Sequence, residues 1–149
     1  MRLALSALVL LLALPAFAVA GENPLPAYEK QARALMEQCF ERTAFLSTSE
    51  ASDLLTQSME KADDLLNAAY KETIRNLKMK DAGLAEALRN DQRSWLKFTE
   101  LFTEKAADGF GEGGTMYITM SISAKLRLFV ERIAFLRIVN RNVVSEDSE

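Results

Sequence analysis

The sequence predicts an all-α fold: an antiparallel helical bundle of three long helices with a shorter N-terminal helix ahead of them. Apolar residues recur every three or four positions over most of the chain, which is the spacing of one helix face. No stretch alternates polar and apolar residues for long, as a half-buried strand would, and no long internal repeat is present. These observations favour a helical bundle over any fold that contains a sheet.

The first 20 residues have the features of a secretory signal peptide. Arg2 precedes an unbroken apolar run that ends in Ala18-Val19-Ala20, a small-residue cleavage pattern, with Ala16 to Ala18 as a near alternative. A membrane anchor is the weaker interpretation, because the run is short and no basic cluster follows it. We therefore expect residues 1–20 to be removed, a periplasmic protein, and no stable membrane insertion after cleavage.

The segment 21–46 contains the start of the helical pattern. Its two prolines come early, and Pro26 suits the first position of a helix, where a backbone N–H is not needed. Apolar residues then fall near one face as far as Leu46, which predicts a first helix over about 26–46.

The second helix has a recognisable start. Ser47 is followed three residues later by Glu50, a capping-box pattern in which each side chain accepts a backbone N–H of the other residue. Apolar residues then step by three and four, which predicts an amphipathic helix over about 48–79. The sequence "KDAG" at 80–83 interrupts it.

Two further helices are expected on either side of a glycine-rich segment. The third covers about 82–107, and "DGFGEGGT" at 108–115 then holds four of the six glycines of the chain. The fourth covers about 115–140 and closes a helical domain expected over 47–141. The acidic end of the chain, residues 142–149, is expected to be disordered.

The composition excludes several functional classes. The chain has no histidine and one cysteine, Cys39, so histidine-based catalysis, histidine metal sites and an internal disulfide are ruled out. Without Arg2, 17 Lys and Arg stand against 21 Asp and Glu, a net charge of −4, and no basic patch suggests nucleic acid. We expect no cofactor, no metal, and a Cys39 thiol buried as a small apolar residue.

Hydrogen-bonding side chains form a line on each of the second and third helices. They are Asp63, Asn67 and Tyr70 on the second helix, and Gln92, Trp95 and Thr99 on the third. Helices joined by a short turn pack antiparallel, so the two lines can meet as a polar seam that fixes the helix register. In this seam Asp63 or Asn67 bonds to Gln92 or to the adjacent Arg93. Tyr70 lies against Trp95. Direct contact with a partner protein is the alternative.

These residues also belong to an ordered set of motifs. "ADDLLNAAY" at 62–70 precedes Q-R-x-W-L-K-F within 91–100, and "GEGGT" at 111–115 and "RIAFL" at 132–136 follow. In this order and spacing the set resembles the LprI-type lysozyme-inhibitor family of small exported helical proteins, over about residues 47–137. The resemblance implies a non-enzymatic protein whose partner is a lysozyme-like muramidase.

The chain departs from this family at its cysteines. The family usually follows its tryptophan segment with R-D-x-x-C, where this chain has Thr99, Glu100 and then Thr103. A second family cysteine would fall near Ala124. The resemblance therefore implies that a disulfide bracketing the glycine-rich segment is missing as a unit, and Cys39 could be a remnant of the family's cysteines or simply a buried apolar residue.

An enzymatic interpretation would have to use carboxylates. Glu100, Glu104 and Asp108 lie on one side of the third helix, and Glu112 follows in the glycine-rich segment. Paired carboxylates can hydrolyse glycosides if their pKa values are split, or bind calcium, but no calcium-loop pattern occurs. Because no base and nucleophile pair accompanies them, we expect no enzymatic activity.

The glycine-rich segment is the predicted contact with a partner. It lacks the phosphate-loop pattern and follows a helix, so nucleotide binding is not indicated. Its candidate contacts are Phe110 and Glu112, together with Thr115 and Tyr117 at the start of the fourth helix. Their hydroxyls, backbone N–H groups and aromatic rings could occupy a lysozyme cleft, while the acidic residues of the third helix meet the rim of a basic enzyme.

The sequence therefore predicts an exported, monomeric lysozyme inhibitor or immunity-type protein that acts by occluding the cleft of a muramidase. The alternative is a periplasmic adaptor that holds another protein in an apolar groove and inhibits nothing. An exposed apolar stripe on the first helix would favour the adaptor.

Overall fold

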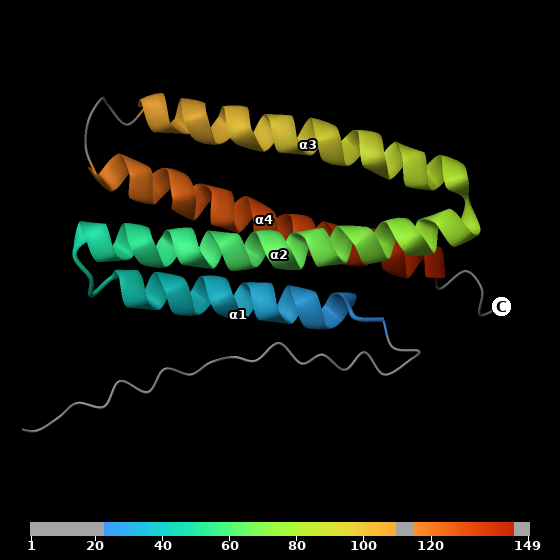
Figure 1. Cartoon of the computed structure of the whole chain (residues 1–149), viewed down its shortest axis with the longest axis horizontal. Coiled ribbons are helices and arrows are strands. Elements are labelled where there is room, and N and C mark those ends of the chain that lie inside the picture. Colours follow the sequence, from blue (N-terminus) through green and yellow to red (C-terminus); the bar gives the residue numbers. More distant parts are fainter. Residues whose placement is uncertain (1–22, 110–114, 145–149) are drawn as a thin grey trace, which may run out of the picture.

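The computed structural model describes residues 23–109 and 115–144, and within these ranges the chain is an all-α bundle, as predicted. The signal-like segment, Phe110, Glu112 and residues 145–149 of the acidic end fall outside the described residues, whereas residues 142–144, expected to be disordered, continue the last helix. Figure 1 shows the helices in antiparallel succession. Their bounds are Leu25–Thr43 for α1, Thr48–Lys80 for α2, Ala82–Gly109 for α3 and Thr115–Val144 for α4. None of these four helices is long and apolar enough to cross a membrane.

The capping box predicted for α2 is confirmed. The Glu50 backbone N–H donates to Ser47 Oγ at 3.4 Å, and Glu50 Oε2 accepts from the Ser47 backbone N–H at 3.0 Å. Hydrogen bonds from the Ser47 side chain and backbone also lower the pKa of Glu50. α2 therefore starts where the sequence predicts, because its first free N–H groups are satisfied locally.

The connection between α2 and α3 is a single residue, Asp81. Its backbone is extended (φ −154°, ψ 117°), and its Oδ1 accepts the Gly83 backbone N–H at 2.6 Å at the start of α3. One residue outside the helical range is thus enough to reverse the chain, and α3 runs back antiparallel to α2.

Two helices, α2 and α4, are central to the bundle, and α4 is the last one in the sequence. Each of them contacts the other three helices, whereas α1 and α3 contact only α2 and α4 within the described residues. Figure 1 accordingly shows α3 along one edge, close to α2 at the Asp81 turn and separating from it toward the other end. α3 is therefore an edge helix with one packed side and one free side.

The core lies between α1, α2 and α4. Its fully buried large side chains include Leu25, Leu55, Leu66, Leu126, Ile133 and Leu136. Cys39 is 2% exposed and is a free thiol within this core, as expected of a small apolar residue.

A polar pair lies within the same core. Asn140 on α4 is fully buried, and its Oδ1 accepts from Asn76 Nδ2 on α2 at 2.8 Å. This bond favours one register of the two helices, because sliding either helix would leave the buried Asn140 Oδ1 without its donor.

Candidate partner-binding site

The free side of α3 presents large apolar residues toward its C-terminal end. Phe98 and Leu101 are each 56% exposed and Phe102 is 44% exposed. The rings of Phe98 and Phe102 stack on each other, with centroids 5.6 Å apart and an interplanar angle of 22°. Exposed apolar residues in such a group are typical of a surface that contacts another molecule.

Two of the acidic residues predicted to contact a partner lie on the same free side of α3, and Leu101 separates them from the two phenylalanines. Glu100 and Glu104 are both exposed on α3. The backbones of Asp108, Thr115 and Tyr117 lie in α3 and α4, on either side of residues 110–114, but their side chains are outside the described part of the structure. The described residues thus place two of the predicted carboxylates on an accessible surface of α3, at the opposite margin of its free side from the Phe98 and Phe102 rings.

The α2 members of the predicted polar seam have local partners. Asp63 and Asn67 are both exposed, and Asn67 Nδ2 donates to Asp63 Oδ2 at 3.1 Å within the same helix. Tyr70 is half-buried and packs against the apolar core. This line stabilises α2 by an i,i+4 bond of the kind worth about 0.2–0.5 kcal/mol.

Gln92 and Trp95 on α3 contact α4 instead, which corrects the expected pairing with α2. Gln92 Oε1 accepts from Arg132 Nε at 2.8 Å, and the Trp95 ring meets Phe129 at 5.4 Å. Arg93 is exposed and donates to Asn90 Oδ1 at 3.1 Å within α3. The physical reason is that α4 packs against both α2 and α3, so the polar line of α3 faces α4 rather than the Asp63 line.

Arg132 is the centre of this second cluster. Its guanidinium lies 5.2 Å from the Trp95 ring and 4.6 Å from the Phe135 ring, and it also pairs with Asp91. Arg132 is only 7% exposed, whereas the Asp91 side chain is 52% exposed. A buried guanidinium is stable here because planar rings and two acceptors replace its water, which joins α3 to α4.

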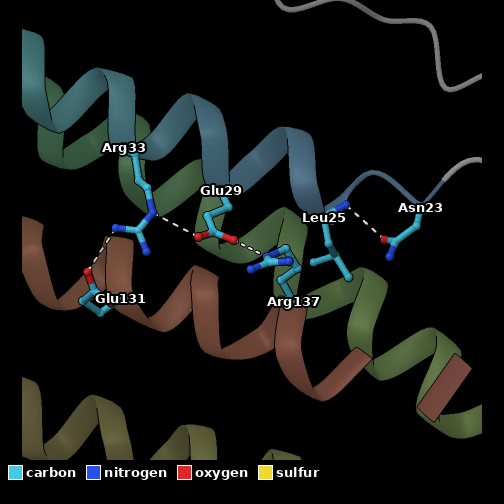
Figure 2. A network of polar contacts seen from close by, with 6 residues as sticks. All are labelled: Asn23, Leu25, Glu29, Arg33, Glu131 and Arg137. Carbon is cyan, nitrogen blue, oxygen red and sulfur yellow. Dashed lines mark hydrogen bonds and ion pairs between the residues drawn. The ribbon is translucent and has the colours of Figure 1, made fainter. Parts of the chain in front are cut away.

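A third polar network joins α1 to α4 and is shown in Figure 2. Glu29 accepts from Arg33 Nε at 3.0 Å and pairs with Arg137 through its other oxygen. Arg33 Nη1 also reaches Glu131 Oε1 at 3.3 Å. Burial alone would raise the pKa of Glu29, but the hydrogen bonds and charges of the two guanidinium groups outweigh it and hold this pKa below its usual value.

The Glu29 network borders a shallow surface pocket. The pocket is lined mainly by charged side chains of α1 together with Arg137 of α4. Two of the cations that line it, Arg33 and Arg137, are paired with Glu29 and Glu131, so we interpret this network as an attachment of α1 to the bundle. Among the described residues no group of three or more potential ligands could hold a metal ion.

Sequence reasoning missed the partners of these networks. The sequence motif that contains Arg132 was recognised, but the residues that Arg132 contacts were not predicted. Asn140 and Glu29 each read only as a polar residue near an apolar stripe. A sharper criterion would have been available for Asn140, which is at a position where the α4 periodicity requires an apolar residue.

Comparison with known proteins identifies a family. The model of one protein family, described as "Lysozyme inhibitor LprI", matches residues 29–136. The match begins within α1, ahead of the motifs recognised from residue 47, and ends within α4. Neither a curated protein nor a solved structure matches the chain significantly.

Proposed function

Because this chain belongs to the LprI lysozyme-inhibitor family over most of its length, we propose that it is an exported, non-enzymatic protein that binds a lysozyme-type muramidase and blocks its cleft. Family membership is the observation that carries this proposal. In the same proposal the apolar run of residues 1–20 is a signal peptide, and the mature protein acts in the periplasm.

The end of the α3–α4 hairpin is the proposed contact. Exposed apolar area from Phe98, Leu101 and Phe102 supports it, since such area gains most from being covered by a partner. Glu100 and Glu104 would meet the basic rim of the muramidase and accelerate encounter more than they tighten binding.

The segment between the two helices would enter the cleft. Phe110, Glu112, Thr115 and Tyr117 are the side chains assigned to this contact by the sequence. A muramidase cleft binds sugar by stacking and hydrogen bonds and contains two carboxylates, so an aromatic ring with hydroxyls and backbone N–H groups is a suitable plug.

The test is a titration of several muramidases, host-type and bacterial, with purified residues 21–149. Stoichiometric loss of one activity is expected, and Thr115→Ala with Tyr117→Ala should weaken it. No loss with any enzyme, for a protein shown to be folded by circular dichroism, would refute inhibition and leave the adaptor role as the alternative.

Charge variants separate the rim contact from general electrostatics. Glu100→Gln with Glu104→Gln should slow association with a basic muramidase, and the slowing should disappear at high salt. The matched control is Glu37→Gln with Glu41→Gln, another exposed pair at i,i+4 spacing but on α1. Equal slowing by both pairs would show that net charge, not the α3 surface, is responsible.

The observation that would favour the adaptor is not found on α1. Tyr28, Leu35, Met36 and Phe40 pack against the core, and none of the strongly exposed large apolar residues described in the structure lies in α1. Most of the exposed large apolar residues described in the structure lie on α3 and α4, which supports the inhibitor proposal, and the other two are Phe45, between α1 and α2, and Met79 on α2.

A further inference from the structure

The free side of α3 has an ordered surface between residues 93 and 104. Gln92, Thr99 and Thr103 are buried and define the packed side of this helix. Six other residues at spacings of three and four are all exposed and form one stripe, which we call the outer face of α3. They are Arg93, Leu96, Lys97, Glu100, Leu101 and Glu104.

The charges of the outer face are segregated along the helix. Arg93 and Lys97 are like charges at i,i+4, and so are Glu100 and Glu104, and each such pair is unfavourable within an isolated helix. Some exposed arginines elsewhere on the bundle are paired within their own helix, as Arg75 is with Glu72. The two like-charged pairs of the outer face have no such intrahelical partner, and they carry opposite signs at the two ends of one stripe.

These charges also lack ion-pair partners within the described residues. Lys97, Glu100 and Glu104 make no ion pair there, and Arg93 donates only to the Asn90 side chain at 3.1 Å. They are free to meet charges of another molecule without first breaking a salt bridge.

The charges of the outer face are complementary to those of a second copy of the same face in antiparallel orientation. About a two-fold axis between residues 98 and 99, position 93 of one copy lies opposite position 104 of the other, and 97 lies opposite 100. Arg93 then meets Glu104 and Lys97 meets Glu100, and the symmetry repeats both pairs. A parallel arrangement would instead place each residue against its own copy, so that like charges met. The charge order therefore selects the antiparallel arrangement.

The apolar residues obey the same symmetry. Leu96 and Leu101 are equally distant from the axis, and they are 39% and 56% exposed. They flank the charged positions, so they lose water when two outer faces meet while the charges pair between them. A contact made by one helix from each copy is smaller than the roughly 1,200–2,000 Å² of a standard interface, so the association is weak.

We propose that the outer face of α3 is a self-association surface, on which two copies of this chain pair α3 against α3 in antiparallel orientation. The pairing departs from the monomer expected from the sequence and does not depend on muramidase binding. Because the contact rests on charges at an exposed surface, it is concentration-dependent and weakened by salt.

A charge exchange tests the proposal. Glu100→Lys with Glu104→Lys makes the outer face wholly basic, and Arg93→Glu with Lys97→Glu makes it wholly acidic. The wild-type protein, obtained by expressing the full chain, should show a mass in sedimentation equilibrium that rises with concentration at low salt. This rise should be lost at about 1 M salt, where the screening length is about 3 Å.

The exchanged variants give the decisive comparison. Each alone should stay monomeric, since every facing pair then repels, whereas an equimolar mixture should form a heterodimer at least as readily as the wild type. Circular dichroism on each variant establishes that it is folded, and Glu37→Lys with Glu41→Lys on α1 is the matched control, which should associate like the wild type.

Three results would overturn the proposal. They are a wild-type protein that stays monomeric at every concentration, exchanged variants that still self-associate, and folded variants that fail to pair when mixed. The second result would point to the Phe98 and Phe102 surface as the contact. Muramidase titration is a separate readout, so loss of inhibition with unchanged association would bear on the proposed function alone.

Discussion

Replacing Arg132 tests whether the cluster between α3 and α4 holds the edge helix to the bundle. Arg132→Met keeps an unbranched apolar stem of similar reach and removes the guanidinium. It deletes the bond to Gln92, the pair with Asp91 and the contacts with two aromatic rings. The variant isolates the polar function of the side chain from its packing.

The expected loss can be built from these contacts. Gln92 is 7% exposed, and stranding its amide oxygen costs about 1–3 kcal/mol. The two ring contacts contribute about 0.5–1 kcal/mol each, and the pair with the half-exposed Asp91 carboxylate at most about 1 kcal/mol. Arg132→Met should therefore lower the free energy of unfolding by about 2–6 kcal/mol.

A double-mutant cycle measures the coupling between Arg132 and Gln92. Gln92→Leu alone should cost about 2 kcal/mol, because it leaves the buried Arg132 Nε–H without its acceptor. The double variant removes both polar groups, so its loss should fall short of the sum of the single losses by at least about 1 kcal/mol. Urea unfolding followed by circular dichroism measures all four proteins, and an unchanged m-value confirms that the same surface is exposed.

Arg127→Met is the matched control on the same helix. Arg127 is exposed and lies 4.6 Å from the Phe40 ring, so this variant should lose no more than about 1 kcal/mol. Additive single losses within about 0.5 kcal/mol, or equal losses for Arg127 and Arg132, would show that the cluster is not the coupled unit described above.

Three further predictions concern the other contacts between helices. Because the pKa of Glu29 is lowered in the folded protein, its ionised form stabilises the fold above the ordinary carboxyl pKa of 4.5, and this stability is lost as the pH falls through the folded-state pKa. Glu29→Gln should therefore unfold more easily than the wild type near neutral pH and approach it in acid, as measured by urea titrations at several pH values. Asn76→Ala should cost about 1–3 kcal/mol in chemical denaturation, because the Oδ1 of buried Asn140 loses its donor, whereas Asn76→Leu combined with Asn140→Leu should cost less than Asn76→Ala. Ser121 Oγ lies 3.4 Å from the Thr103 carbonyl oxygen, so Thr103→Cys with Ser121→Cys should form a disulfide detectable by thiol titration and raise stability by up to about 3 kcal/mol; free thiols after oxidation would contradict the close approach of α3 and α4 at this point.

The helices could be predicted from the sequence because the patterns that indicate them involve only neighbouring residues. Ser47 and Glu50 form a cap from neighbouring residues alone, and a spacing of three and four defines an apolar face without knowledge of the partner. The end of α1 was less accurate: the helix ends at Thr43 rather than near Leu46, since apolar periodicity continues into the connection while the helix does not.

The contacts between helices were not accessible in the same way. Periodicity places Gln92 on a face of α3, but which helix meets that face depends on how the whole bundle closes. Consecutive helices are usually neighbours, which favoured α2, yet α4 takes this position and supplies Arg132. The pair of Glu29 with Arg137 joins segments near opposite ends of the described chain, and nothing local to either residue indicates the other.

Because α4 is one of the two central helices and the last in the sequence, we expect its synthesis to limit when the core can close. A chain that is synthesised or exported from its N-terminus exposes the apolar faces of α1 and α2 before α4, which covers them, has emerged. Leu136 and Asn140, which complete the core, arrive among the last residues of the described chain. Closure must therefore wait for contacts between distant segments, so the nascent chain remains open until it is nearly complete. A chain truncated before Leu136 would keep most of its helical sequence and still lack the means to close its core.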